Sequence, residues 1–255
     1  MTQIITLCIF AFLADLIDSI VGGGGLIQLP ALLVLLPNTA IPLIMGTSKL
    51  SSFAGTSVAA IRFSKIVPIS SLIVLVAAIT AFIFSYIGAK TVSIIHPDII
   101  RPIILLVLIV VGIYTLFKKD FGVQYFFKPQ DRKQVISAAI IGSLLGFYDG
   151  FLGPGTGSFL IFAFISILGF DFLRASAAAK FVNFATNLSA LIYFSFTNNV
   201  IYHLALPMAI SNMLGASIGS QLALMRGSSF IRIIFIVVVS ILITKLAYDI
   251  FFSKS

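Results

Sequence analysis

The sequence predicts an all-α polytopic membrane protein built from two homologous repeats. Three observations predict this fold: the composition is strongly apolar, long apolar runs follow one another along the chain, and the second half repeats the first. Of 255 residues, 60% are hydrophobic and 9% are charged, and the mean hydropathy is +1.17. Because a helix needs about 20 apolar residues to cross a hydrocarbon core of about 30 Å, several crossings are expected.

The repeat appears when the chain is shifted against itself by 131 residues, which aligns the halves without a gap. The shift matches residue types that are scarce in this sequence: Asp18 with Asp149, Gly22 with Gly153, Gly24 with Gly155, Lys49 with Lys180, Gly88 with Gly219, and Arg101 with Arg232. Apolar matches would be frequent by chance in so apolar a chain, but these are not. We therefore divide the chain into repeat 1 (1–117), a charged cytoplasmic linker (118–133) and repeat 2 (134–255).

Each repeat opens with an apolar run that glycines interrupt. The interruptions are DSIVGGGGLIQLP at 18–30 and DGFLGPGTGSFLI at 149–161. Three further apolar segments follow each one, near 40–61, 68–90 and 101–117 in repeat 1 and near 171–193, 200–224 and 231–250 in repeat 2. Each repeat is thus expected to contain a glycine-broken helical hairpin and three transmembrane helices.

The charges of the loops indicate how the repeats are oriented. If the first run were one straight helix, its 33 residues would be about 50 Å long, more than one crossing needs. If it folds back as a hairpin, each half crosses an odd number of times and the halves are inverted. The basic loop residues then divide ten to three: Arg62, Lys65, Lys118, Lys119, Lys128, Arg132, Lys133, Arg174, Arg226 and Arg232 against Lys90, Arg101 and Lys254. Parallel halves would give eight to five, so the positive-inside rule favours inverted repeats with both termini outside.

The glycine breaks are candidates for an anion-binding site. A glycine-rich turn followed by a helix leaves backbone N–H groups free at the positive end of the helix dipole. Gly24 and Gly25 in the first break, with Gly155, Thr156 and Gly157 in the second, would let the backbone approach a small anion closely. Inverted repeats with broken helices are also a recurrent transporter design, with the substrate near the midplane. The alternative is that the glycines only form tight hairpins or allow close helix packing.

Two lysines lie near the middle of equivalent predicted helices, where a lysine is costly to insert. At helical spacings of three and seven residues, Lys49 shares a face with Ser52 and Thr56, and Lys180 shares one with Asn183 and Asn187. Ammonium, hydroxyl and amide groups together suit an oxyanion. Two interpretations remain: at least one lysine contacts the substrate, or both form structural ion pairs with aspartates.

Asp18 and Asp149 immediately precede the two breaks. They can neutralise the lysines, accept hydrogen bonds from the turns, or carry a coupling proton, and a carboxylate beside helix-end amides favours the structural roles. Asp15 has no counterpart among the matched aspartates, and two interpretations remain for it: a residue at the outer mouth of the site, or a carrier of the coupling proton.

The motifs as a whole resemble those of the sulfite exporter TauE/SafE family. The pattern D-S-I-x-G-G-G-G-x-I-x-x-P, a downstream T-S-K, D-G-F-x-G-P-G-T-G and A-x-A-A-A-K-x-x-N cover nearly the whole chain. The resemblance implies a multi-pass protein of the bacterial cytoplasmic (inner) membrane that moves small sulfur-containing anions such as sulfite, thiosulfate or organosulfonates. Asp15 departs from the pattern, which has a small or apolar residue at that position.

The sequence therefore predicts a secondary transporter of a small anion that works by alternating access, with an anion channel as the alternative. The chain carries no Walker motif, so a gradient, for example of protons or sodium, would supply the energy. The partners expected are the anion, the lipid bilayer and, in a homodimer, a second copy.

Other classes of function are not expected. The net charge of +8 comes from basic residues scattered among the loops, which does not favour nucleic-acid binding. Cys8 is the only cysteine, and His96 and His203 are far apart in the sequence. We therefore expect no enzymatic activity, no metal site and no cofactor.

Overall fold

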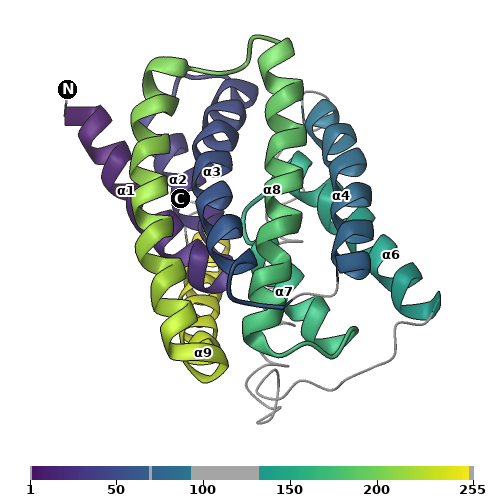
Figure 1. The fold of residues 1–255 in the computed structure, drawn as a ribbon. Helices are drawn as coiled ribbons and strands as arrows, with labels where there is room; N and C mark the ends of the chain where they lie inside the picture. Colours follow the sequence, from purple (N-terminus) through teal and green to yellow (C-terminus); the bar gives the residue numbers. More distant parts are fainter. Residues whose placement is uncertain (1, 69–70, 93–131, 253–255) are drawn as a thin grey trace.

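In the computed structural model, residues 2–68, 71–92 and 132–252 are described, and over these ranges the protein is made of helices and their connections (Figure 1). The helices are α1 (Thr2–Val21), α2 (Gly25–Leu35), α3 (Ile41–Ser64), α4 (Ser71–Thr91), α6 (Arg132–Phe151), α7 (Thr156–Ser166), α8 (Phe172–Phe196) and α9 (Tyr202–Phe252). This confirms the all-helical prediction for the described residues. The predicted segment 101–117 and the linker as far as residue 131 lie outside them.

Several helices have the length and composition of membrane spans. Among the described residues, α1, most of α4 (Leu72–Thr91) and α6 are long and apolar enough to cross a bilayer. Large apolar side chains such as Ile79, Ile83 and Leu214 are more than half exposed, at 52%, 52% and 58%. An outward-facing apolar surface of this kind suits contact with lipid.

The first apolar run is folded back on itself at the glycines. Helix α1 ends at Val21 because Gly22 adopts a φ of 77°, in the left-handed region that glycine enters without a steric penalty. The side chain of Gln3, near the start of α1, donates a hydrogen bond to the carbonyl of Leu35, the last residue of α2. The two helices therefore form a hairpin and not one straight helix. With 11 residues, α2 is about 16 Å long, roughly half a crossing.

The helix boundaries follow the 131-residue shift. Helix α7 begins at Thr156 and ends at Ser166, and Gly25 and Leu35, the ends of α2, lie 131 residues earlier. Likewise α3 and α8 begin at residues 41 and 172. Helix α9 joins two predicted segments, 200–224 and 231–250, with a break between them at Gly227, whose φ is 71°.

Helices α3 and α8 cross the centre of the molecule in opposite directions (Figure 1). Near the start of α3, Gly46 lies so close to Phe194 at the end of α8 that a Cβ added to it would be 2.8 Å from the Phe194 Cβ. In the middle of the same two helices, the rings of Phe53 and Phe184 are 5.2 Å apart. Both helices bury polar residues, so their shared centre is where a polar site can form.

The outer helices pack crosswise between the halves of the chain. Helix α1 packs against α9, and α6 packs against α4. Glycine permits both contacts: a Cβ on Gly219 would lie 2.2 Å from the Leu16 carbonyl oxygen, and one on Gly88 would lie 2.2 Å from that of Phe147. These two contacts are related by the 131-residue shift, since 88 + 131 = 219 and 16 + 131 = 147.

Candidate functional site

The two glycine breaks meet tip to tip. A Cβ on Gly22 would lie 2.3 Å from the carbonyl carbon of Gly157, a distance that real side chains do not reach. The amide of Ser158 donates to the Gly22 carbonyl at 2.7 Å, and its hydroxyl donates to the carbonyls of Val21 and Gly22 at 3.0 and 3.1 Å. Glycine at both positions is thus required for the breaks to form a single unit.

A polar cavity lies beside this junction. Its volume is about 50 Å³, enough to hold a few water molecules. It is lined by Ala14, Asp15, Asp18, Gly22, Gly24, Gly25, Gln28, Leu29, Met45, Ser48, Lys49, Ser52, Thr56, Asp149, Leu152, Gly153, Pro154, Gly155, Thr156, Gly157, Asn183 and Asn187. Of the residues that the sequence places in the candidate site, the cavity brings together all except Lys180.

The helices that follow the breaks begin at this cavity. Helix α2 starts at Gly25 and α7 starts at Thr156. Among the described residues, the N–H groups of Gly25, Gly155 and Gly157 find no acceptor. Free N–H groups at the first turn of a helix carry the positive end of its dipole, so both helix starts favour a negative ligand.

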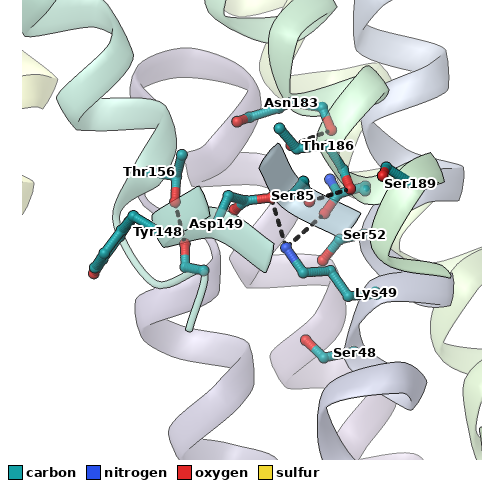
Figure 2. Close-up of polar contacts among 12 residues, drawn as sticks. Ser48, Lys49, Ser52, Ser85, Tyr148, Asp149, Thr156, Asn183, Thr186 and Ser189 are labelled. Carbon is teal, nitrogen blue, oxygen red and sulfur yellow. Dashed lines mark hydrogen bonds and ion pairs between the residues drawn. The ribbon is translucent and has the colours of Figure 1, made fainter. Parts of the chain in front are cut away.

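Lys49 lines the cavity and bonds to residues of the other half of the chain. Its Nζ donates to Oδ2 of Asp149 at 2.6 Å and to Oδ1 of Asn187 at 3.2 Å (Figure 2). A Cβ on Gly153, whose φ is 87°, would lie 3.2 Å from this Nζ, so the second break leaves room for the ammonium group. Lys49 therefore brings a positive charge to the cavity wall, already balanced by one carboxylate.

Lys180 occupies the equivalent position but a different environment. Its side chain is fully buried, and its Nζ donates to Oδ2 of Asp18 at 2.9 Å and to the Asp18 carbonyl. Oδ1 of Asp18 in turn accepts from the N–H of Gly24 at 3.1 Å. Lys180 thus bonds to the last turn of α1 and stabilises the first break. Its side chain does not line the cavity.

The amides of α8 differ in how far they are engaged. Asn187 accepts from Lys49 through Oδ1 and donates through Nδ2 to Oγ1 of Thr56 at 3.4 Å. Asn183, which is 5% exposed, has an Oδ1 without a hydrogen-bond partner. Figure 2 shows both the labelled Asn183 and Thr156 near the Asp149–Lys49 pair. Asn183 is therefore the amide with unused hydrogen-bonding capacity at the cavity.

The sequence prediction missed a second polar group at this site. Nε2 of Gln28 donates to the hydroxyl of Ser48 at 3.0 Å and to that of Ser52 at 3.4 Å. Its Oε1 accepts from Nδ2 of Asn212, a fully buried residue of α9, at 3.0 Å. The available signal was Gln28, the one side-chain amide of the otherwise apolar α2, because a polar residue is retained in such a helix only when it finds a partner or a function.

An apolar helical exterior that encloses a charged cavity defines a membrane-embedded protein with a binding site for a small polar ligand. The comparisons with known proteins identify which class this is. A family model described as sulfite exporter TauE/SafE matches residues 7–246. The chain belongs to this family and is a membrane transporter, not an enzyme.

Curated relatives match along nearly their whole length. A "probable membrane transporter protein" of Haemophilus influenzae is 32% identical over 244 residues, covering 93% of this chain and 92% of the relative. The "probable membrane transporter protein YfcA" of Escherichia coli K12 is 35% identical over 247 residues, covering 94% and 87%. A "probable membrane transporter protein ORF9" of a Sinorhizobium species is 32% identical over 249 residues, covering 95% and 92%. No solved structure matches the chain.

Proposed function

We propose that the protein is a secondary transporter of a small sulfur-containing oxyanion or organosulfonate in the bacterial cytoplasmic membrane. The observation that carries the proposal is the cavity where two helix starts present N–H groups without acceptors, at Gly25, Gly155 and Gly157. Such groups bind an anion through hydrogen bonds and the helix dipole without requiring a free positive side chain. The family's description names sulfite, and this favours a sulfur oxyanion among the small anions.

In this proposal the anion lies between the two breaks. The N–H groups of both helix starts donate to its oxygens, and Asn183 contributes an amide. The Thr156 hydroxyl donates to the Gly153 carbonyl at 2.8 Å in this structure, and it would turn away from this carbonyl to donate to the anion. Lys49 stays paired with Asp149 and supplies positive charge at close range. Lys180, Asp18 and Gly24 keep the first break in shape.

Alternating access would follow from inverted repeats. The opposite directions of α3 and α8, the matched boundaries of α2 and α7, and the crosswise pairs Lys49–Asp149 and Lys180–Asp18 all support two structurally equivalent halves. A rocking of one half against the other would exchange the environments of the two breaks and open the cavity to each side in turn.

The test is transport by the purified protein in proteoliposomes. We expect uptake of at least one radiolabelled anion from a panel of sulfite, thiosulfate, methanesulfonate and taurine, and little uptake of lactate or succinate. A carrier accelerates tracer entry when unlabelled substrate is present inside, whereas a channel does not. Uptake without this acceleration would contradict alternating access and support a channel, and no uptake of any sulfur anion would contradict the substrate class.

A further inference from the structure

Three carboxylates line the cavity, one more than the two buried lysines beside it can balance. Asp18 is paired with Lys180, and Asp149 is paired with Lys49. Asp15 also lines the cavity, yet within the described residues it forms no ion pair. A third negative charge among these buried groups repels an incoming anion, so the site carries a net negative charge toward the proposed substrate unless Asp15 is neutralised.

The surroundings of Asp15 do not compensate its charge. Its exposed fraction is 3%, and its Oδ2 has no hydrogen-bond partner. The fully buried Asn212 of α9 has an Oδ1 that is equally without a partner. Both lie against Gly55 of α3: a Cβ there would be 1.3 Å from Oδ2 of Asp15 and 3.2 Å from the Asn212 Cβ. A buried carboxylate in this position takes up a proton or a cation in preference to remaining charged.

The other half of the chain shows that helix packing does not require these polar groups. The shift of 131 residues relates Asp15 to Gly146 and Asn212 to Ala81. There, at the α6–α4 contact, a Cβ on Gly146 would lie 2.5 Å from the Ala81 Cα. Two small residues thus fill this place in one half, and a carboxylate and an amide fill it in the other. Because burying the polar pair is costly, its presence indicates a role other than packing.

We propose that Asp15 is the proton-coupling site of the transporter. The carboxylate takes a proton from water on one side of the membrane, forming an O–H bond that can donate to the unpartnered Oδ1 of Asn212. With Asp15 neutral, the two aspartate–lysine pairs leave the cavity uncharged, and the N–H groups of the breaks then bind the anion. After the cavity opens to the other side the O–H bond breaks and the proton leaves with the anion. The inference rests on the proposed anion transport and adds the coupling ion to it.

The neighbouring charges are consistent with this role. The charged groups that act on Asp15 are Asp18, one turn further along α1, which disfavours a second negative charge, and Lys180 of α8, which is already bonded to Asp18. Lys49 of α3 and Asp149 of α6 lie in the same cavity wall and form the other pair. Where α2 and α9 face the site they contribute the uncharged amides Gln28 and Asn212.

The first experiment measures proton binding independently of transport. Infrared spectra of the purified wild-type protein are recorded over a pH titration, and those of Asp15→Asn are subtracted. We expect a protonated-carboxyl band in the difference that disappears as the pH rises. Asp171→Asn serves as the matched control, because Asp171 caps α8 outside the cavity and asparagine caps a helix equally well. The absence of an Asp15-dependent carboxyl band at every pH would overturn the proposal.

The second experiment measures coupling in proteoliposomes with radiolabelled thiosulfate and methanesulfonate, whose charges do not change near neutral pH. In the wild type, with the membrane potential clamped at zero because one proton does not balance the two charges of thiosulfate, an inward pH gradient of about one unit should drive accumulation of up to about tenfold, since one unit is a tenfold difference in proton activity. Asp15→Asn should exchange anion but accumulate it less than about twofold, while Asp171→Asn should behave as the wild type.

The outcomes separate coupling from transport. The proposal that Asp15 couples transport to protons is overturned if Asp15→Asn accumulates anion to the same level as the wild type. It is also overturned if a sodium gradient drives accumulation and the pH gradient has no effect. If no anion is transported, the proposed function fails and the infrared titration alone decides whether Asp15 binds a proton. Should Asp15→Asn fold poorly, the double variant Asp15→Gly/Asn212→Ala replaces it, because it copies the residue pair that packs in the other half.

Discussion

At the scale of single residues, the two lysines show how equivalent sequence positions acquire different roles. Both are buried and both are bonded to an aspartate of the other half. Lys49 lines the cavity, whereas Lys180 has no exposed surface and also bonds the Asp18 backbone. Removing one member of a buried pair leaves an uncompensated charge and costs about 3–5 kcal/mol. Single lysine substitutions therefore test stability more than binding.

Pairwise neutral variants separate the two roles. We expect Lys49→Met/Asp149→Asn to fold but to weaken anion binding by about tenfold or more, because it removes the positive charge that lines the cavity beside the anion. Lys180→Met/Asp18→Asn should lower thermal stability while changing affinity less than about threefold, since this pair lies behind the cavity surface. Isothermal titration with the transported anion, alongside thermal unfolding in detergent, measures both. Equal losses of affinity in the two variants would place Lys180 at the substrate after all.

At the scale of elements, the broken hairpins determine how the cavity is built. In both repeats the helix after the break begins at the residue that the 131-residue shift predicts, although the preceding glycines differ in conformation: φ is −60° at Gly24 and 82° at Gly155. The tips nevertheless contact each other unequally. Gly157 packs against Gly22, but Leu26 stands at the position equivalent to Gly157, so the reverse contact cannot form.

The unequal contacts of the two hairpin tips explain which features the sequence could predict and which it could not. The hairpins, their boundaries and most of the cavity lining follow from local patterns of glycine and apolar residues. Which lysine reaches the cavity depends on contacts between distant segments, such as Ser158 with Gly22. The bonds among Gln28, Ser48 and Asn212 likewise join three helices, and no spacing within one segment reveals them.

The glycines of the breaks are expected to respond differently to an added methyl group. Gly22→Ala should yield little folded protein, because its Cβ would overlap the Gly157 backbone. Gly25→Ala should fold, since its Cβ meets the Pro154 Cα at 3.1 Å and small shifts can relieve this contact. Its methyl group would lie beside a free N–H group of the cavity and lower the affinity for the anion. Uptake per amount of monodisperse protein is the measurement.

Gly227→Ala is the control for this comparison. Gly227 has a φ of 71° and a ψ of −166°, and nothing lies within 4 Å of an added Cβ, so alanine there introduces backbone strain of about 1–3 kcal/mol without a clash. It should lower stability moderately and leave anion affinity unchanged. If Gly25→Ala binds and transports as well as Gly227→Ala does, the N–H groups of the first break do not hold the substrate.

At the scale of the whole molecule, the crosswise contacts make each half depend on the other. The first helix of each half packs on a helix of the other half, α1 on α9 and α6 on α4, and each buried lysine is neutralised by an aspartate across the same boundary. If either half were present alone, its buried lysine would lack its aspartate partner. This mutual dependence suits two halves that move against each other about their shared centre, where α3 crosses α8.

The orientation of the halves gives the last prediction. With Cys8 replaced by serine, single cysteines are introduced at the connections of the described helices: Asn38, Lys65, Ser166 and Thr197, all exposed or at exposed turns. Inverted halves place the α3–α4 and α7–α8 connections on one side and the α2–α3 and α8–α9 connections on the other. The positive-inside rule assigns the first side, with Lys65 and Arg174, to the cytoplasm.

A membrane-impermeant maleimide should therefore label Asn38→Cys and Thr197→Cys in intact cells. Lys65→Cys and Ser166→Cys should react only after the membrane is permeabilised. The informative comparison is between Lys65 and Thr197, because Lys65 + 131 gives residue 196 and the two sites are near-equivalent in the repeat. Labelling of both from the same side would mean parallel halves, and then the crosswise pairs could not exchange environments in the way that alternating access requires.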